Sequence, residues 1–192
     1  MTSTTDRATN LDAERGELLA ALAEARANLI ATTEGLTDEQ AAERPTVSAL
    51  CLGGLLKHVA EGEQQWMSFV TDGPSAMTFE LPDGARWADI MAGTAREVPQ
   101  WMIEYAEGFQ LRSGETLAGV VANYERVAAR TEKIIAEVPD LSAARRLPAV
   151  PWGDSGKMFS IRQVLLHLIA EVAEHAGHAD ILRETLDHGG KD

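Results

Sequence analysis

The sequence is poor in cysteine, in aromatic residues and in positive charge. One Cys among 192 residues cannot form an internal disulfide, and a chain of this length buries enough surface to fold without one. Aromatic residues make up 5% of the chain, and strand-like runs of Val, Ile, Tyr and Phe are missing. Lys and Arg number 17 against 30 Asp and Glu, a net charge of -13, which argues against nucleic acids and anionic membrane surfaces as partners.

Sequence signals of several other protein classes are missing too. No run of about 18 apolar residues indicates a membrane span, and the N-terminus lacks the apolar segment of an export signal. We therefore expect a cytoplasmic protein. The sequence also lacks a Gly-rich phosphate loop, a Ser-His-Asp order and a Cys-x-x-Cys pair, which argues against phosphoryl transfer and dithiol redox chemistry.

The length predicts a single domain. Residues 1–9 are small and polar and are expected to form a flexible arm, whereas residues 10–188 are expected to form the domain.

The hydrophobic pattern of the domain is helical. Apolar residues recur at helical spacing over four long segments, at residues 10–35, 52–71, 115–138 and 161–186. Capping-box sequences predict helix starts after Thr37 and Ser160. The pattern weakens over residues 72–114, where short helices are predicted at 87–96 and 101–107, and residues 140–159 are irregular. We therefore predict an all-α fold, a four-helix bundle with two long crossover connections.

Titratable residues interrupt the apolar face of the last predicted helix. Glu171 and His175 are four residues apart, so both side chains can reach one point in the bundle interior. His58 lies in a similar way among the apolar positions of the helix predicted at 52–71. Gly62 follows His58 by one turn, and its small size predicts that a neighbouring helix approaches closely there.

Together, His58, Glu171 and His175 predict a divalent metal site. Burying these groups without partners is costly, whereas neutral imidazoles and a carboxylate are ordinary metal ligands. Two His and one carboxylate suit catalytic zinc; they also match the arrangement used by non-haem iron, and nickel is a further alternative. The competing interpretation makes each of them a hydrogen-bonded structural residue, since Glu-x-x-x-His often occurs by chance.

Four polar residues near these positions have less definite roles. His178 could be a further ligand, a proton carrier or a group that orients a ligand, and we favour the last two. Glu61 could orient His58 or act as a base, with a solvated helix charge as the simpler alternative. His167 and Glu174 lie on a more polar side of the last helix and are expected to be structural.

Cys51 and the tryptophans also allow two interpretations. Cys51 precedes the predicted helix at 52–71, where a helix N-terminus could lower the pKa of its thiol, but a small buried filler is the preferred interpretation. The tryptophans line either a pocket mouth or the core; they are Trp66, Trp87, Trp101 and Trp152.

The chain resembles a known superfamily in several segments. They are residues 46–66 (TVSALCLGGLLKHVAEGEQQW), Pro151-Trp152, Phe159-Ser160 and residues 167–184 (HLIAEVAEHAGHADILRE). They are similar to the DinB-like superfamily, in particular to an actinobacterial branch of unknown function related to mycothiol-dependent maleylpyruvate isomerase and mycothiol S-transferases. The resemblance extends from about residue 15 to residue 186.

The resemblance implies a bundle in up-down-down-up order, commonly a homodimer, with a divalent metal between the second and last long helices. The superfamily's ligand positions fall on His58, Glu171 and His175. Glu in place of a second His on the last helix looks like the Glu-x-x-x-His form of the maleylpyruvate isomerase and favours the thiol-dependent branch. His178 stands where many members have Gln, which argues against a ligand role.

Three functions follow as hypotheses. The leading one is a metal-dependent S-transferase or isomerase that uses mycothiol or a similar small thiol and an electrophilic substrate, with His178 or Glu61 moving a proton. The second is a non-catalytic metal- or ligand-binding bundle with a stress-related role. Zinc-dependent hydrolysis is the third.

Overall fold

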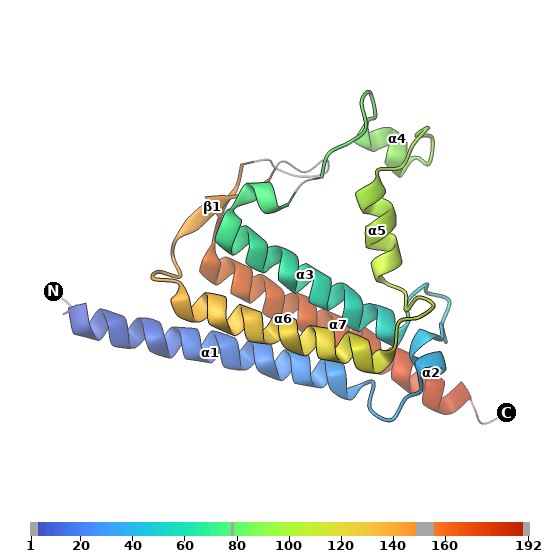
Figure 1. The fold of residues 1–192 in the computed structure, drawn as a ribbon, viewed down its shortest axis with the longest axis horizontal. Helices are drawn as coiled ribbons and strands as arrows, with labels where there is room; N and C mark the ends of the chain where they lie inside the picture. Colours follow the sequence, from blue (N-terminus) through green and yellow to red (C-terminus); the bar gives the residue numbers. More distant parts are fainter. Residues whose placement is uncertain (1–3, 78, 149–155, 190–192) are drawn as a thin grey trace.

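The computed structural model describes residues 4–77, 79–148 and 156–189, and they form a helical bundle (Figure 1). The four long helices are α1 (Thr4–Ala31), α3 (Leu52–Asp72), α6 (Leu117–Glu137) and α7 (Ile161–Gly189). Shorter elements connect them: α2 (Asp38–Ala42), the 3-10 turn η1 (Pro74–Ala76), α4 (Trp87–Met91) and α5 (Gln100–Gly108). The predicted all-α fold class is confirmed.

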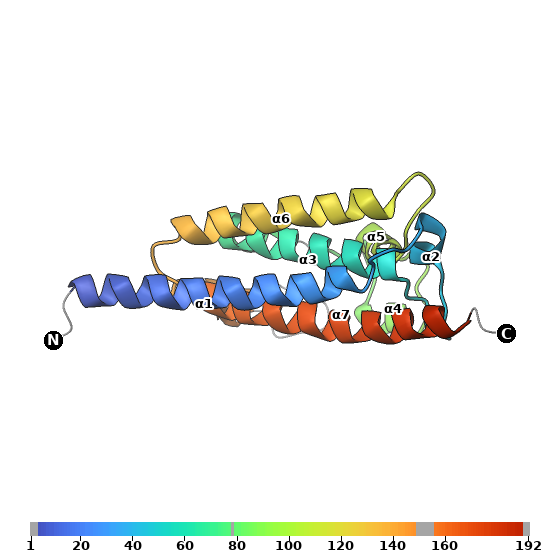
Figure 2. The same ribbon diagram turned by 90° about the horizontal axis from the view of Figure 1, so that it is seen from below.

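The helices follow the up-down-down-up order. In Figures 1 and 2, α1 and α7 run in one direction, while α3 and α6 run in the other. Helix α7 packs against both α1 and α3, and α3 also packs against α6. Because α3 and α6 are parallel, the chain between them must return along the length of the bundle, and residues 73–116 with α4 and α5 make this crossover.

Local sequence signals explain where several helices begin. The amide of Gln40 donates to Thr37 Oγ1 (3.2 Å) and the amide of Thr37 donates to Gln40 Oε1 (3.0 Å), so the predicted capping box forms. Ser160 and Gln163 make the same pair of hydrogen bonds, at 2.9 and 3.2 Å, before α7. Both predicted helix starts are confirmed.

Two features differ from the sequence-based expectation. Helix α1 begins at Thr4, six residues before the start expected at residue 10, and no Gly or Pro lies between residues 4 and 9 to stop it. Residues 140–159 were expected to be irregular, but β1 (Ala144–Arg146) pairs with β2 (Met158–Ser160) as a small antiparallel sheet, with Ala144 opposite Ser160. Pairing across a long connection leaves little signal in three-residue strands.

A continuous apolar core fills the bundle. Its fully buried members come from all four long helices and include Leu22, Leu29, Leu55, Leu56, Tyr124, Ile135, Leu165 and Val172. None of the helices in the described part of the chain is long and apolar enough to span a bilayer.

A buried ion pair crosses this core. The Arg26 guanidinium on α1 donates to both carboxylate oxygens of Glu63 on α3, at 3.0 and 2.5 Å, and Thr131 on α6 donates to the same carboxylate. Glu63 is fully buried and Arg26 is 5% exposed. The network therefore links α1, α3 and α6 through the core.

Candidate functional site

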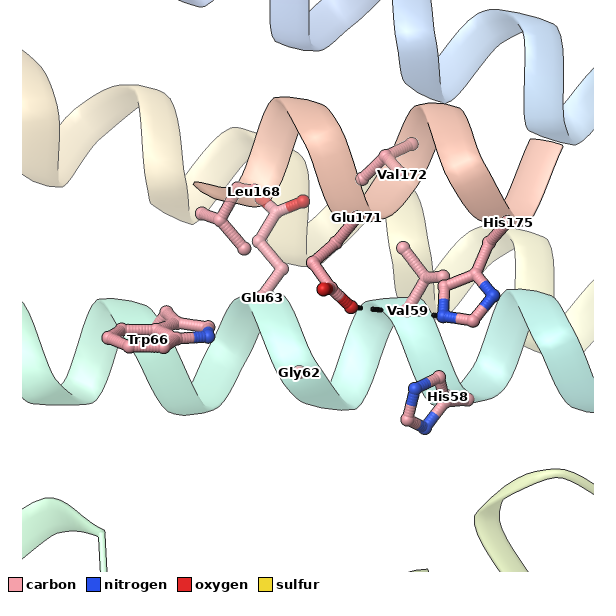
Figure 3. Close-up of a pocket in the computed structure, with 9 residues that line it drawn as sticks. All are labelled: His58, Val59, Gly62, Glu63, Trp66, Leu168, Glu171, Val172 and His175. Atoms are coloured by element: carbon pink, nitrogen blue, oxygen red, sulfur yellow. Dashed lines mark ion pairs between the residues drawn. The ribbon is translucent and has the colours of Figure 1, made fainter. Parts of the chain in front are cut away.

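A small cavity of about 40 Å³ lies between α3 and α7 (Figure 3). Helix α3 contributes five lining residues, and α7 contributes four: His58, Val59, Gly62, Glu63 and Trp66, then Leu168, Glu171, Val172 and His175. The structure thus brings His58, Glu171 and His175 to one place. The side chain of Glu171 is 45% exposed, so the cavity reaches the protein surface.

His58 is held among aromatic rings from the crossover. Its imidazole stacks on Phe109, with ring centroids 3.9 Å apart and planes at 23°, and the edge contact with Tyr105 has a centroid separation of 5.2 Å. A third ring, His175, stands nearly perpendicular to His58 at 5.1 Å. Burial first, and repulsion from His175 second, lower the pKa of His58 to about 4. His58 is therefore neutral near pH 7, as a metal ligand must be.

Glu171 and His175 face each other across one turn of α7. Glu171 Oε2 lies 3.9 Å from His175 Nε2, and Figure 3 shows the carboxylate directed at that nitrogen. Burial lowers the pKa of His175, while the Glu171 carboxylate acts in the opposite direction and His178 adds to the lowering. The other ring nitrogen of His175, Nδ1, is buried and has no hydrogen-bond partner among the described residues.

The donor set fits a divalent ion, although the described residues do not form a closed ligand cage. No group of three or more His, Cys, Asp or Glu side chains among them is already close enough together to hold a metal. Two imidazoles on one tetrahedral ion would have ring centres about 5 Å apart, given metal–nitrogen bonds of about 2.1 Å, and His58 and His175 match this separation. The unpartnered Nδ1 of His175 also calls for an ion or water.

The two predicted acid–base residues lie outside the cavity lining. His178 is exposed on α7, and its ring centroid is 5.7 Å from that of His175. Glu61 is exposed on the side of α3 next to Gly108 and close to the ion pair of Lys57 with Glu115 (2.7 Å). Partial burial raises the pKa of Glu61, and Lys57 acts against this shift. Of the two, His178 has a ring contact with a cavity residue, His175.

The remaining sequence candidates fall into different surroundings. Trp66 lines the cavity, and its ring contacts that of His167 at 4.8 Å. Trp87 and Trp101 stack on each other in the crossover at 6.5 Å, away from the cavity lining. Trp152 lies outside the described residues.

Cys51 is 1% exposed and acts as the N-cap of α3. Its sulfur accepts from the amide of Gly54 (3.4 Å) and donates to the carbonyl of Phe109 (3.6 Å). The interpretation of Cys51 as a small buried residue agrees with this burial. Glu174 is exposed on α7.

The expected close helix approach at Gly62 is wrong. A Cβ added there would meet no atom within 4 Å, so Gly62 borders open space. The close approach is at Gly54, where an added Cβ would lie 1.9 Å from the carbonyl oxygen of Phe109. Gly54 therefore seats the end of α5 against α3 and brings Phe109 onto His58.

Sequence reasoning missed three residues of this region. Tyr105 and Phe109 lie in a connection whose weak pattern gave no sign of contact with His58. Glu63 lines the cavity and is fully buried, although a Glu next to polar residues reads as a solvated charge. A usable signal was the spacing of Tyr105 and Phe109, which puts both rings on one side of a helix.

Comparisons with known proteins agree with the fold and with the sequence motifs. Residues 17–188 match the family described as mycothiol-S-transferase, which confirms the resemblance to the DinB-like superfamily. A crystal structure described as a conserved protein of locus from Enterococcus faecalis is similar with a TM-score of 0.60 and 15% identity, over 89% of this chain and 95% of that chain. That likeness concerns the fold alone. No curated protein matches the sequence significantly.

Proposed function

The chain belongs to the mycothiol-S-transferase family, and on this premise we propose that it transfers mycothiol or a similar small thiol to an electrophilic substrate with the help of a divalent metal. The observation that carries the proposal is the convergence of His58, Glu171 and His175 on one solvent-reaching cavity. These three residues are the proposed ligands. Zinc is the first candidate, because two imidazoles and one carboxylate leave a zinc position open for another group, with nickel and iron as alternatives.

A bound divalent ion would lower the pKa of a thiol placed beside it and so raise the thiolate fraction at neutral pH. The proton leaves the thiol, the sulfur forms a bond to the electrophilic carbon, and the bond from that carbon to its leaving group breaks with the electron pair going to the leaving group. His178 is exposed beside His175 and is the proposed carrier that takes this proton to solvent. Glu61 is outside the residues that line the cavity, so we assign it a smaller part in moving the proton.

The protein supplies no nucleophilic sulfur in this scheme. The one cysteine is buried and hydrogen bonded at the start of α3. The reactive sulfur therefore arrives with the co-substrate. The role of the chain is to hold the metal, orient His58 through its aromatic neighbours and exclude water from the inner end of the cavity.

A thiol-consumption assay tests the proposal. Mycothiol and phenacyl chloride are incubated with zinc-loaded protein, with chelator-treated protein and with chelated protein to which zinc is returned, and free thiol is measured over time. We expect accelerated loss only with metal, and no acceleration by His175→Ala. His188→Ala is the matched control, since His188 is an exposed histidine at the end of the same helix. Equal thiol loss with and without metal would contradict the proposal.

The isomerase version of the proposal predicts a different product. A thiol that adds to a double bond and is later expelled is returned unchanged, so the substrate isomerises without net loss of thiol. The assay separates the two versions when maleylpyruvate replaces the chloride and the product is identified by NMR.

One observation favours the non-catalytic alternative. A cavity of about 40 Å³ is too small to enclose a whole thiol together with a whole electrophile, so both molecules must extend beyond its open side. A metal-binding bundle without activity would bind zinc in the wild type, lose it in His175→Ala, and consume no thiol with any electrophile tested.

The homodimer implied by the resemblance is also part of the proposal. Leu166 and Ile181, on α7, are 51% and 59% exposed, so their side chains are available for a contact between two copies of the chain. Sedimentation equilibrium over a range of protein concentrations tests the dimer directly.

A further inference from the structure

Three lining residues form one line along α3. His58, Gly62 and Trp66 follow one another at intervals of four residues, so they share one face of the helix, and all three border the cavity. Figure 3 shows Gly62 between the two rings, with α7 opposite. The middle position of this line therefore has no side chain.

Neither the backbone nor the packing requires glycine at position 62. Gly62 is inside α3 and has no positive φ, and an added Cβ would meet no atom within 4 Å. A glycine inside a helix weakens it relative to alanine. Glycine at position 62 therefore weakens α3 relative to alanine, and it leaves open space beside the cavity.

Trp66 closes one end of that space. Its indole is fixed by ring contacts with Phe69 at 5.6 Å, Phe159 at 5.5 Å and His167 at 4.8 Å. Figure 3 shows the indole nitrogen directed along α3 towards Gly62. Within the described part of the chain nothing accepts a hydrogen bond from this nitrogen, which can act only as a donor.

The other boundaries of the space differ in polarity. Leu168 and Val172 on α7 are apolar and buried, and both line the cavity. Beyond Gly62, the opposite end holds His58 and His175, where the proposed metal binds. The space thus has an apolar wall, a ring with a free donor at one end and the reacting groups at the other.

We propose that the space over Gly62 is the binding slot for the apolar part of the electrophilic substrate. An oxygen atom of that substrate accepts a hydrogen bond from the indole N–H of Trp66. This inference rests on the proposed thiol transfer. The substrate class it names is a small, flat, apolar electrophile that carries a carbonyl or similar oxygen. Gly62 then determines specificity because it has no side chain to fill the slot. Trp66 determines specificity because its ring closes one end of the slot and its N–H donates a hydrogen bond.

A binding experiment tests the slot without any catalysis. Acetophenone has the shape of phenacyl chloride but no leaving group, so it binds without reacting. We expect it to shift the indole N–H resonance of Trp66 in ¹⁵N-labelled, metal-free protein, with the resonance assigned from its loss in Trp66→Phe. Gly62→Leu fills the slot and is expected to abolish the shift. Gly16→Ala is the matched control, because Gly16 is also a helical glycine with open space around it, on α1.

A kinetic experiment then links the slot to turnover. With phenacyl chloride, Gly62→Leu is expected to raise the KM for the electrophile at least tenfold, with the KM for mycothiol changed less than twofold, and Gly16→Ala is expected to change neither. Trp66→Phe is expected to raise the KM for phenacyl chloride more than that for benzyl chloride, which has no acceptor oxygen.

The two proposals fail in different ways. No shift of the Trp66 resonance in the wild type, or an equal shift in Gly62→Leu, would overturn the slot, whatever the thiol assay shows. A slot-dependent shift together with no metal-dependent thiol loss would overturn the thiol transfer, and with it the assignment of the slot to an electrophilic substrate.

Discussion

The imidazole rings of His58 and His175 stand edge to face, with centroids 5.1 Å apart, although they come from different helices of the bundle. His58 is on α3 and His175 on α7, and these two helices are antiparallel neighbours. Two neutral imidazoles at this distance, with the Glu171 carboxylate beside them, are the basis of the proposed metal site.

Replacing Glu171 tests its role as a ligand. Glu171→Ala removes a donor and is expected to weaken zinc binding by at least about tenfold, whereas Glu171→His supplies a new donor at the same position and is expected to retain zinc. Competition with a chromogenic chelator measures both affinities. Glu174→Ala, an exposed Glu on the same helix, is the control and should bind zinc as the wild type does.

The metal-free protein is expected to lose stability as the pH falls from about 6.5 to about 4. The pKa of His58 is lowered to about 4 by burial and by His175, while the unfolded chain has a His pKa of about 6.5. Between these values the unfolded state binds more protons, so the stabilising contribution is complete above pH 6.5 and is lost towards pH 4. Urea denaturation at several pH values measures this loss.

His58→Gln is the comparison that isolates this effect. Carboxylates also take up protons in acid, but they do so in both proteins, so the difference between the two curves belongs to His58 and to its effect on His175. The curve of His58→Gln is expected to be flatter between pH 6.5 and 4. Parallel curves would show that burial does not lower the pKa of His58.

Gly54 and Gly62 are expected to respond in opposite ways to alanine. At Gly54 the new Cβ would overlap the carbonyl of Phe109, so Gly54→Ala is expected to destabilise the protein by about 2 kcal/mol or more. At Gly62 the methyl group meets nothing, so Gly62→Ala is expected to stabilise it by about 0.5–1 kcal/mol through helix propensity. Chemical denaturation measures both; a loss of stability in Gly62→Ala would contradict the open space.

The buried pair of Arg26 and Glu63 is expected to matter far more than a surface pair. Arg26→Met leaves the Glu63 carboxylate buried without its cation and is expected to cost about 3–5 kcal/mol. Arg162 pairs with Glu14 at the surface, both about one-third exposed, and Arg162→Met is expected to cost less than about 1 kcal/mol. Similar losses of unfolding free energy in the two variants would contradict the distinction.

Cys51 is expected to react slowly with an aromatic disulfide reagent in the native protein and rapidly in urea. Its side chain is buried, so labelling requires local opening of the start of α3. Cys51→Ser keeps a capping oxygen at the N-cap and is expected to retain thiol transfer. Loss of transfer in a stably folded Cys51→Ser would show that the protein itself supplies the reactive sulfur.

The parts of the site that the sequence predicted depend on local spacing. Glu171 and His175 share a face because α7 is a regular helix, and helix periodicity is readable from the sequence. The boundaries of α3 were predicted to within one residue, since Gly73 ends the helix and takes a positive φ of 82°. His58 was identified from its apolar neighbours on the same helix.

The parts that the sequence did not predict depend on contacts between distant segments. Phe109 stacks on His58 only because Gly54 lets the end of the crossover approach the backbone of α3. From the sequence, Gly62 was the residue that was expected to allow a close approach. Two helical glycines look alike in a sequence, and only the packed structure shows which one borders a neighbour and which one borders a space.

The sequence by itself determined the class of fold, the four long helices and the capping boxes at Thr37 and Ser160, because helix periodicity and capping are local properties. It also supplied the three donors of the metal site, which stays a proposal. The tertiary structure decided which rings surround His58, that Glu63 is buried against Arg26, and that open space lies over Gly62 beside Trp66. These features depend on how α3, α5 and α7 pack, and packing is set by the shapes of side chains that are far apart in the chain.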